Sequence, residues 1–336
     1  MRARLTAAGW DKDLSIEAHS VPAPPTGMVS IRLEAAGVCH RDLIDRAGRI
    51  PFLQLPVTPG HEGVGRITAV GDGVSAWAVG DRVATLHRDC CGQCSACVSS
   101  QPSLCQRAAR IFGLTVDGTY ASTMLAPESA LYAMPDAVPA PLAAIMHCTF
   151  GTAWRAMVTV GGLQRGESVL ITGANGGVGA AAVQIARRFT EQVTAVVRDP
   201  RHAPWLTQLG ASRVIVSADG AFHRQAQGID LALECVGAPT FNAALRCLRV
   251  GGRVSVVGNV TAERAALNLG HVVVMGKRIL GPGGADPADM AALLAAHREQ
   301  PFEAPVAEVL ALSEADAAQR RLKAGGLQGR LVLTPR

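Results

Sequence analysis

Five of the nine cysteines of this chain fall between Cys90 and Cys105. Four of them have the spacing C-x2-C-x2-C-x7-C, namely Cys91, Cys94, Cys97 and Cys105. Four thiolates from one short loop can close a tetrahedron around Zn²⁺, which leaves no open position for a substrate. We therefore predict a structural zinc lobe at about residues 88–108 rather than a disulfide cluster, with Cys90 as an alternative to Cys91.

A glycine-rich turn lies within SVLITGANGGVGAAAVQIARR, residues 168–188. It follows a short apolar run at 169–172, opens a segment of helical character at 180–188 and precedes a second apolar run, VTAVV. Glycines at such a turn let the backbone approach a pyrophosphate at a helix N-terminus. This context predicts a dinucleotide site rather than a simple turn. We assign to it Gly173, Ala174, Gly176, Gly177 and Gly179, with Ala174 in place of the first glycine of the pattern.

The elements around these motifs indicate two architectures. Further apolar runs at 214–216, 231–234, 253–257 and 277–280 have the spacing of βα units, which predicts a doubly wound parallel sheet. Before residue 139, short β-like runs such as MVSIRLEAAGV and VGRITAVG alternate with Gly/Pro turns, which is typical of a β-rich domain. Proline at 139–141 and the breaker-rich stretch GPGGADPAD at 281–289 mark the boundaries.

The bulk composition excludes several classes of protein. The chain has 336 residues, which indicates two domains, and its net charge of +5 comes without any basic run of five, which argues against nucleic acid. The longest uncharged run, 137–154, contains two prolines and a histidine, so we predict a buried helix rather than a membrane span. The N-terminus has no apolar signal region, so we expect a cytoplasmic protein with reduced thiols.

The cysteine lobe, GVCHRD and GHEGVGRITAVGDGVSAWAVGDRV together resemble the zinc-containing medium-chain dehydrogenase/reductase superfamily, which includes the alcohol dehydrogenases. The resemblance covers nearly the whole chain. It implies an α/β fold with a GroES-like β-rich catalytic domain at 1–139 and a doubly wound Rossmann NADP(H)-binding domain at 140–285. Residues 286–336 would then return to the catalytic domain. The resemblance also implies a homodimer or homotetramer, with an edge strand near RVSVVGNV or HVVVMGKRIL for pairing.

A second zinc ion, at a catalytic site, follows from the same resemblance. Its ligands would be Cys39, His61 and Cys148, and Glu62 would approach the metal during ligand exchange. Two thiolates and an imidazole leave a fourth position where a substrate oxygen can be polarised. Asp42 would hold the His61 ring from behind. The alternatives are that Cys39 and Cys148 are plain core thiols, and that the neighbouring His147 is a ligand.

The resemblance places further residues against the cofactor. Val178 would lie behind the nicotinamide, Thr152 would touch it and His40 would contact the pyrophosphate.

The second strand of the nucleotide domain bears on the choice between NADP(H) and NAD(H). An NAD enzyme places an acid at the end of that strand, about 20 residues past the glycines. Alignment puts Val197 there, followed by Arg198 and, nearby, Arg201. Cations suit a 2′-phosphate, so we predict NADP(H), with a ribose contact from Asp199 as the alternative.

Two reactions fit the resemblance. Interconversion of an alcohol with an aldehyde or ketone comes first because the zinc ligand set is complete. Reduction of an activated C=C bond, as in acryloyl-coenzyme A reductases, is the alternative. It is favoured by the ANGGVG variant, which resembles the quinone and enoyl reductase branches, and by similarity in residues 236–260. A zinc-less, crystallin-like binding protein is a more remote alternative.

The two reactions differ in their need for side chains that carry a proton away from a zinc-bound oxygen, because alcohol chemistry usually requires such a path. Alcohol dehydrogenases carry a Ser or Thr two residues after the first Cys ligand and often a His three further on, whereas this chain has Arg41 and Ile44. Arg41 would hold an anionic small-molecule substrate or pair with an aspartate, Asp42 or Asp45. His87 occupies a substrate-pocket position, as a substitute proton donor or as a passive wall.

Overall fold

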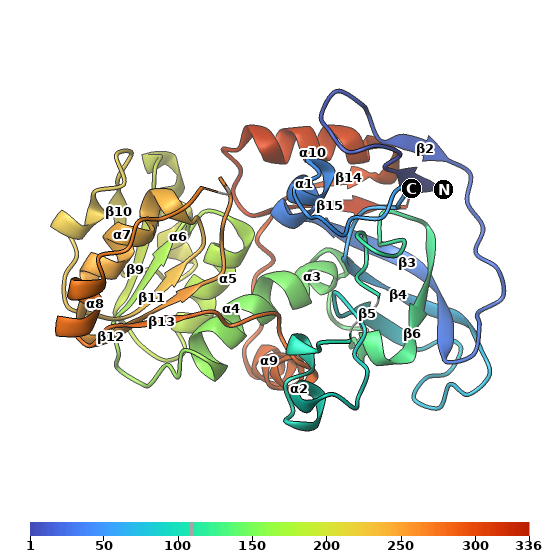
Figure 1. Cartoon of the computed structure of the whole chain (residues 1–336), viewed down its shortest axis with the longest axis horizontal. Helices are drawn as coiled ribbons and strands as arrows, with labels where there is room; N and C mark the ends of the chain where they lie inside the picture. The colour runs from blue at the N-terminus through green and yellow to red at the C-terminus, as the bar shows by residue number, and fades with distance from the viewer. Residues whose placement is uncertain (108–109, 262, 336) are drawn as a thin grey trace. The chain divides into compact units, whose positions relative to one another are not determined.

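The structure is a computed structural model that describes residues 1–107, 110–261 and 263–335 (Figure 1). The chain forms two compact units, Met1–Cys148 with Val306–Arg336, and Thr149–Pro305. Each unit has its own sheet, and together they confirm the predicted α/β fold class.

The first unit is built on a seven-stranded sheet in the order β14-β15-β3-β4-β5-β7, with β6 also paired to β3. Its strands are β3 (Met28–Val38), β4 (Glu62–Val70), β5 (Arg82–Thr85), β6 (Thr123–Pro127), β7 (Leu131–Ala133), β14 (Val306–Ala311) and β15 (Arg330–Thr334). A separate pair joins β1 (Arg2–Arg4) to β2 (Ser15–Glu17). The helices are α1 (His40–Arg46), α2 (Ser95–Val98), α3 (Ala140–Ile145) and α10 (Ala315–Ala324). Helix α10 lies beside α1 in this unit (Figure 1).

The second unit carries a six-stranded sheet in the order β10-β9-β8-β11-β12-β13, in which every pairing is parallel. This is the 3-2-1-4-5-6 order of a Rossmann domain. Its strands are β8 (Val169–Thr172), β9 (Val193–Val197), β10 (Arg213–Val216), β11 (Ile229–Glu234), β12 (Leu248–Val256) and β13 (Arg278–Leu280). Its helices are α4 (Thr152–Trp154), α5 (Gly177–Ala186), α6 (Ala203–Gln208), α7 (Ala238–Cys247), α8 (Leu269–Val274) and α9 (Pro287–Glu299).

Short helical segments of other types connect these elements. Two π-type segments, η3 (Met146–Gly151) and η4 (Arg155–Thr159), flank α4. The 3-10 turns are η1 (Pro102–Leu104), η2 (Glu128–Ala130), η5 (Pro200–His202), η6 (Phe222–Arg224) and η7 (Leu312–Glu314). None of the helices that the structure describes combines the length and the apolar character needed to span a membrane.

The predicted strands around the glycine turn match the structure closely. The runs at 169–172 and VTAVV are β8 and β9 with the same bounds. Helix α5 begins at Gly177, three residues before the predicted segment, because glycines of the turn itself enter the helix. Strand β12 begins at Leu248, five residues before the predicted run, because its pairing with β11 continues across a register shift.

The unit boundary near residue 286 differs from the expected one. We expected the return to the first domain to start there, whereas the second unit continues to Pro305. Arg155 explains the difference, because its Nη1 lies 2.5 Å from Asp286 and 2.9 Å from Asp289 at the start of α9. All three side chains are buried, so α9 is anchored to the second unit. At the other boundary the first unit extends to Cys148, because α3 packs on β3 and β4.

Candidate metal and nucleotide sites

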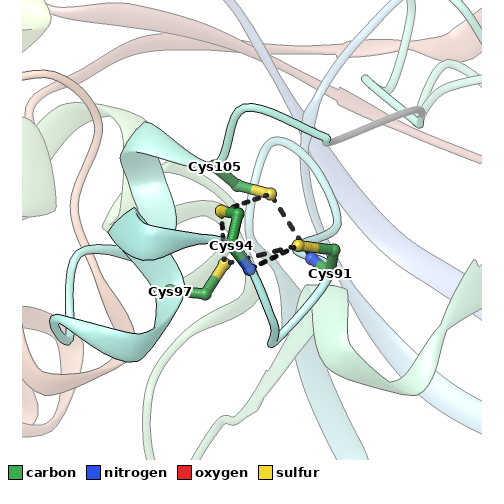
Figure 2. A group of neighbouring side chains, drawn as sticks. All are labelled: Cys91, Cys94, Cys97 and Cys105. Atoms are coloured by element: carbon green, nitrogen blue, oxygen red, sulfur yellow. Dashed lines mark hydrogen bonds between the residues drawn. The ribbon is translucent and has the colours of Figure 1, made fainter.

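The cysteine loop between β5 and β6 brings four sulfur atoms together (Figure 2). The Sγ–Sγ distances are 3.6 Å for Cys94–Cys97, 3.8 Å for Cys94–Cys105 and 4.0 Å for Cys91–Cys97. Sulfur ligands around a tetrahedral zinc ion are about 3.8 Å apart. The backbone N–H groups of Gln93 and Cys94 point at the Cys91 sulfur, which favours its thiolate. The loop therefore fits a structural zinc ion, and the group does not include Cys90.

A second group of donors forms beside the end of β3. The donor atoms of Cys39, His61, Glu62 and Cys148 all lie within 4.8 Å of one another. The Cys148 sulfur is 3.9 Å from the Cys39 sulfur and 3.3 Å from His61 Nε2. The register of β3 with β4, which pairs Gly37 with Glu62, brings the first three residues together. Cys148 comes from η3, directly after α3.

Asp42 lies behind this group, as the resemblance implied. Its Oδ1 is 3.0 Å from His61 Nδ1, and its Oδ2 accepts the backbone N–H of Cys39 at 2.9 Å. The second contact is part of the capping box that starts α1. Burial opposes protonation of the ring, yet Asp42 and Cys39 together raise the pKa of His61 to about 9. With Nδ1 held by the carboxylate, Nε2 is left to face the two sulfurs, which is the orientation that a metal ligand needs.

Arg330 is the site residue that sequence reasoning missed. It begins β15, and its Nη2 lies 2.6 Å from Glu62 Oε1, with both side chains buried. Burial raises the pKa of Glu62 to about 7, although the guanidinium of Arg330 opposes the shift. The one signal in the sequence is a charged residue at the start of an otherwise apolar strand, RLVLT. The pair holds the carboxylate of Glu62 beside the three other donors.

The donor set fits zinc. Two cysteine sulfurs and one imidazole nitrogen converge from three directions, and a carboxylate stands within reach of the same point. When bound there, a zinc ion would keep one position for a substrate oxygen and would polarise it.

Arg41 is anchored within the first unit. Its Nε lies 3.2 Å from Asp45 Oδ2, and its Nη2 donates to the backbone oxygen of Phe112 at 2.5 Å. The structure thus shows the ion pair with Asp45 that was one of the two interpretations of this residue. Burial raises the pKa of Asp45 to about 7, and Arg41 opposes that shift.

His87 and His147 stack on each other with ring centroids 5.4 Å apart. Burial, followed by the charges of His147 and His61, lowers the pKa of His87 well below its usual value, so the ring is neutral. In the described part of the chain, His147 is not among the clustered metal donors.

The glycine turn forms the expected cradle after β8. Gly173 has a φ of +56°, and Gly176 caps the start of α5. A Cβ on Gly179 would lie 2.5 Å from the Gly173 oxygen and 2.6 Å from Ala174 Cα, so only glycine fits there. This close approach of helix and turn is what a pyrophosphate site requires. Of the remaining predicted contacts, Val178 lies in the first turn of α5, Thr152 begins α4 and His40 begins α1.

The two arginines expected near a 2′-phosphate follow β9. Arg198 is exposed and comes directly after Val197, the last residue of the strand. Asp199 is engaged by Arg201, whose backbone N–H and Nε lie 3.0 Å from its two carboxylate oxygens. Asp199, the alternative ribose ligand, also caps the start of η5.

Comparisons with known proteins agree with this geometry. Residues 25–136 match the alcohol dehydrogenase GroES-like domain family, and residues 177–298 match the zinc-binding dehydrogenase family. The chain is 30% identical to an acryloyl-coenzyme A reductase of Sulfurisphaera tokodaii over 98% of this chain and 99% of that protein. It is 33% identical to an alcohol dehydrogenase of Geobacillus stearothermophilus over 96% of this chain and 97% of that one. The crystal structure of AibC superposes with a TM-score of 0.92 at 38% identity, covering 100% of this chain and 95% of that one.

The chain belongs to the zinc-containing medium-chain dehydrogenase/reductase superfamily. It is an oxidoreductase with a GroES-like domain and a Rossmann domain.

We predict that Arg330→Met lowers the free energy of unfolding by about 3 kcal/mol or more, because it removes the guanidinium that lies 2.6 Å from the buried Glu62 carboxylate. Adding Glu62→Gln should recover much of that loss, as measured by urea unfolding. Arg187→Met removes an exposed ion pair with Glu191 and should cost about 1 kcal/mol or less. Equal losses in the two single variants would contradict a buried charge pair.

Proposed function

We propose that this enzyme reduces the C=C bond of an α,β-unsaturated thioester or aldehyde with NADPH. The observation that carries the proposal is Arg41, which stands where an alcohol dehydrogenase has a hydroxyl and is bound to Asp45 and the Phe112 carbonyl. An alcohol substrate needs a neutral group there to take its proton, and a guanidinium stays protonated. From the sequence alone, alcohol–carbonyl interconversion came first. The anchored Arg41 and the similarity to acryloyl-coenzyme A reductases reverse that order.

NADPH held at the glycine turn before α5 would supply the hydride for the β-carbon, and a zinc ion held by Cys39, His61 and Cys148 would polarise the carbonyl oxygen. The α-carbon then takes a proton, so one hydride and one proton are added across the double bond. His87 would orient the substrate through the one N–H of its neutral imidazole, and the proton itself would come from solvent water. A coenzyme A thioester also satisfies the expectation of an anionic small-molecule substrate.

Interconversion of an alcohol with an aldehyde or ketone is the second candidate. The observation that favours it is the complete set of catalytic donors, Cys39, His61 and Cys148.

The substrate class can be tested by following NADPH oxidation with crotonyl-coenzyme A, 2-hexenal, hexanal and a simple ketone, with product identification. We expect turnover of the conjugated substrates to saturated thioesters or aldehydes, and little turnover of hexanal or the ketone. Reduction of hexanal to hexanol at a comparable kcat/KM, with the enal C=C bond left intact, would instead establish the second candidate.

The two donor groups lead us to propose two zinc ions per chain. Metal analysis of protein purified without chelator should give about two zinc ions in the wild type and about one in Cys39→Ala, because only the catalytic set loses a ligand. Cys247→Ala, which removes a buried cysteine outside both groups, should keep two. One zinc ion in the wild type, with no change in Cys39→Ala, would rule out the catalytic site.

The position of Arg198 supports a preference for NADP(H). We expect Arg198→Ala to lower kcat/KM for NADPH by about tenfold or more and to leave that for NADH nearly unchanged, because the guanidinium would pair with the 2′-phosphate. Arg165→Ala, an exposed arginine before β8, is the matched control and should change neither value. A wild-type preference for NADH that Arg198→Ala leaves intact contradicts this part of the proposal.

We also propose that the second unit pairs with another copy of the chain. Strand β13 is at the edge of its sheet, and the neighbouring helix α8 exposes Val273 and Val274 by 77% and 81%. An open sheet edge beside an exposed apolar helix is suited to two-fold pairing. With net charge +5 and no basic run, we propose small molecules and a second copy as partners, without nucleic acid or membrane.

Light scattering at micromolar concentration should show a dimer or tetramer for the wild type and monomers for a Val273→Glu/Val274→Glu double variant. Val79→Glu, at an exposed valine of the first unit, should leave the assembly intact. A monomeric wild type, or a double variant that assembles normally, would refute the pairing.

All nine cysteines are free thiols in the structure. Thiolate ligands must stay reduced to bind zinc, so we propose that the enzyme works in the cytoplasm.

A further inference from the structure

We infer that Tyr120 is a positioning residue of the catalytic metal centre and acts through Asp42. The inference rests on the proposed zinc centre. The Tyr120 hydroxyl donates to Asp42 Oδ2 at 2.9 Å, and both side chains are buried. The same carboxylate holds His61 Nδ1 with its other oxygen and the backbone N–H of Cys39 with this one. One carboxylate thus orients two of the three ligands, and Tyr120 fixes the carboxylate.

The need for Tyr120 follows from the charge of Asp42. In the part of the chain described, no lysine or arginine forms a salt bridge with Asp42. A buried carboxylate is stabilised only by the donors that point at it, which here are two N–H groups and one hydroxyl. Without the hydroxyl, Oδ2 keeps a single donor, and the carboxylate can rotate away from the geometry that directs His61 Nε2 to the sulfurs.

Tyr120 is itself held rigidly. Its ring packs in a buried cluster with Val38, Leu43 and Val57. Its backbone N–H donates to the Pro59 oxygen at 2.9 Å, which ties it to the segment just before His61. A Cβ on Gly60 would lie 2.3 Å from Tyr120 Cδ1, so the glycine of the GHE motif makes room for this ring. The ring and the backbone of Tyr120 are therefore both held in place, and together they fix the position of its hydroxyl.

The test compares Tyr120→Phe with Tyr132→Phe. These are the two tyrosines of the chain, and both are buried. The Tyr132 hydroxyl has no hydrogen-bond partner in the described structure, so its removal is a matched control. The zinc dissociation constant of the catalytic site is measured by competition with a chelator, using Cys39→Ala to identify that site. Thermal unfolding is recorded alongside.

We expect Tyr120→Phe to weaken zinc binding by about 10- to 100-fold and Tyr132→Phe to change it by less than about twofold. In an Asp42→Asn background, Tyr120→Phe should weaken zinc binding little further, because Tyr120 acts on the metal site only through Asp42. Wild-type zinc affinity in Tyr120→Phe, equal weakening in both phenylalanine variants, or full additivity with Asp42→Asn would each overturn the inference. If Cys39→Ala removes no zinc from the wild type, the proposed centre fails and this inference fails with it.

Discussion

The buried carboxylate of Asp42 is the constraint around which the first unit is organised. It must find donors for both oxygens inside the protein, since a buried charge without partners is unstable. The donors come from three separate segments: Cys39 at the start of α1, His61 at the start of β4, and Tyr120 before β6. Satisfying the carboxylate therefore brings two of the proposed metal ligands, Cys39 and His61, to the same place.

The same region holds further buried charges that form ion pairs, one between distant segments and one within α1. Glu62 is paired with Arg330 of the C-terminal strand, and Asp45 with Arg41 one helical turn away. The thiols of Cys39 and Cys148 lie beside these ion pairs, and both would lose their protons on binding a metal cation. Arg330 belongs to β15, which pairs with β3, so the last strand of the chain contributes one of these buried charges to the first unit.

Features encoded by neighbouring residues were predictable from the sequence, and those created by distant ones were not. Two local patterns show this: the glycine turn after β8, and the spacing of Cys91, Cys94, Cys97 and Cys105. In the structure the four cysteines lie together and the turn leads into α5, as predicted. The contacts of Tyr120 with Asp42 and of Arg330 with Glu62 span 78 and 268 positions, and no periodicity signals them. The proposed catalytic ligands, Cys39, His61 and Cys148, are also distant from one another in the sequence, and only the family resemblance connected them. The second unit continues to Pro305, beyond the boundary expected near residue 286, and the ion pairs of Arg155 with Asp286 and Asp289 hold α9 in that unit.

We propose that Cys39, His61 and Cys148 form a metal centre distinct from the four-cysteine lobe. X-ray absorption at the zinc edge measures the ligands directly in the wild type and in Cys39→Ala. We expect a wild-type average of about three sulfur ligands per zinc, with imidazole scattering, because a four-sulfur site and a two-sulfur site contribute equally. In Cys39→Ala the average should rise to about four sulfurs as the imidazole signal disappears. A wild-type spectrum of four sulfurs without imidazole would rule out a zinc ion bound by Cys39, His61 and Cys148.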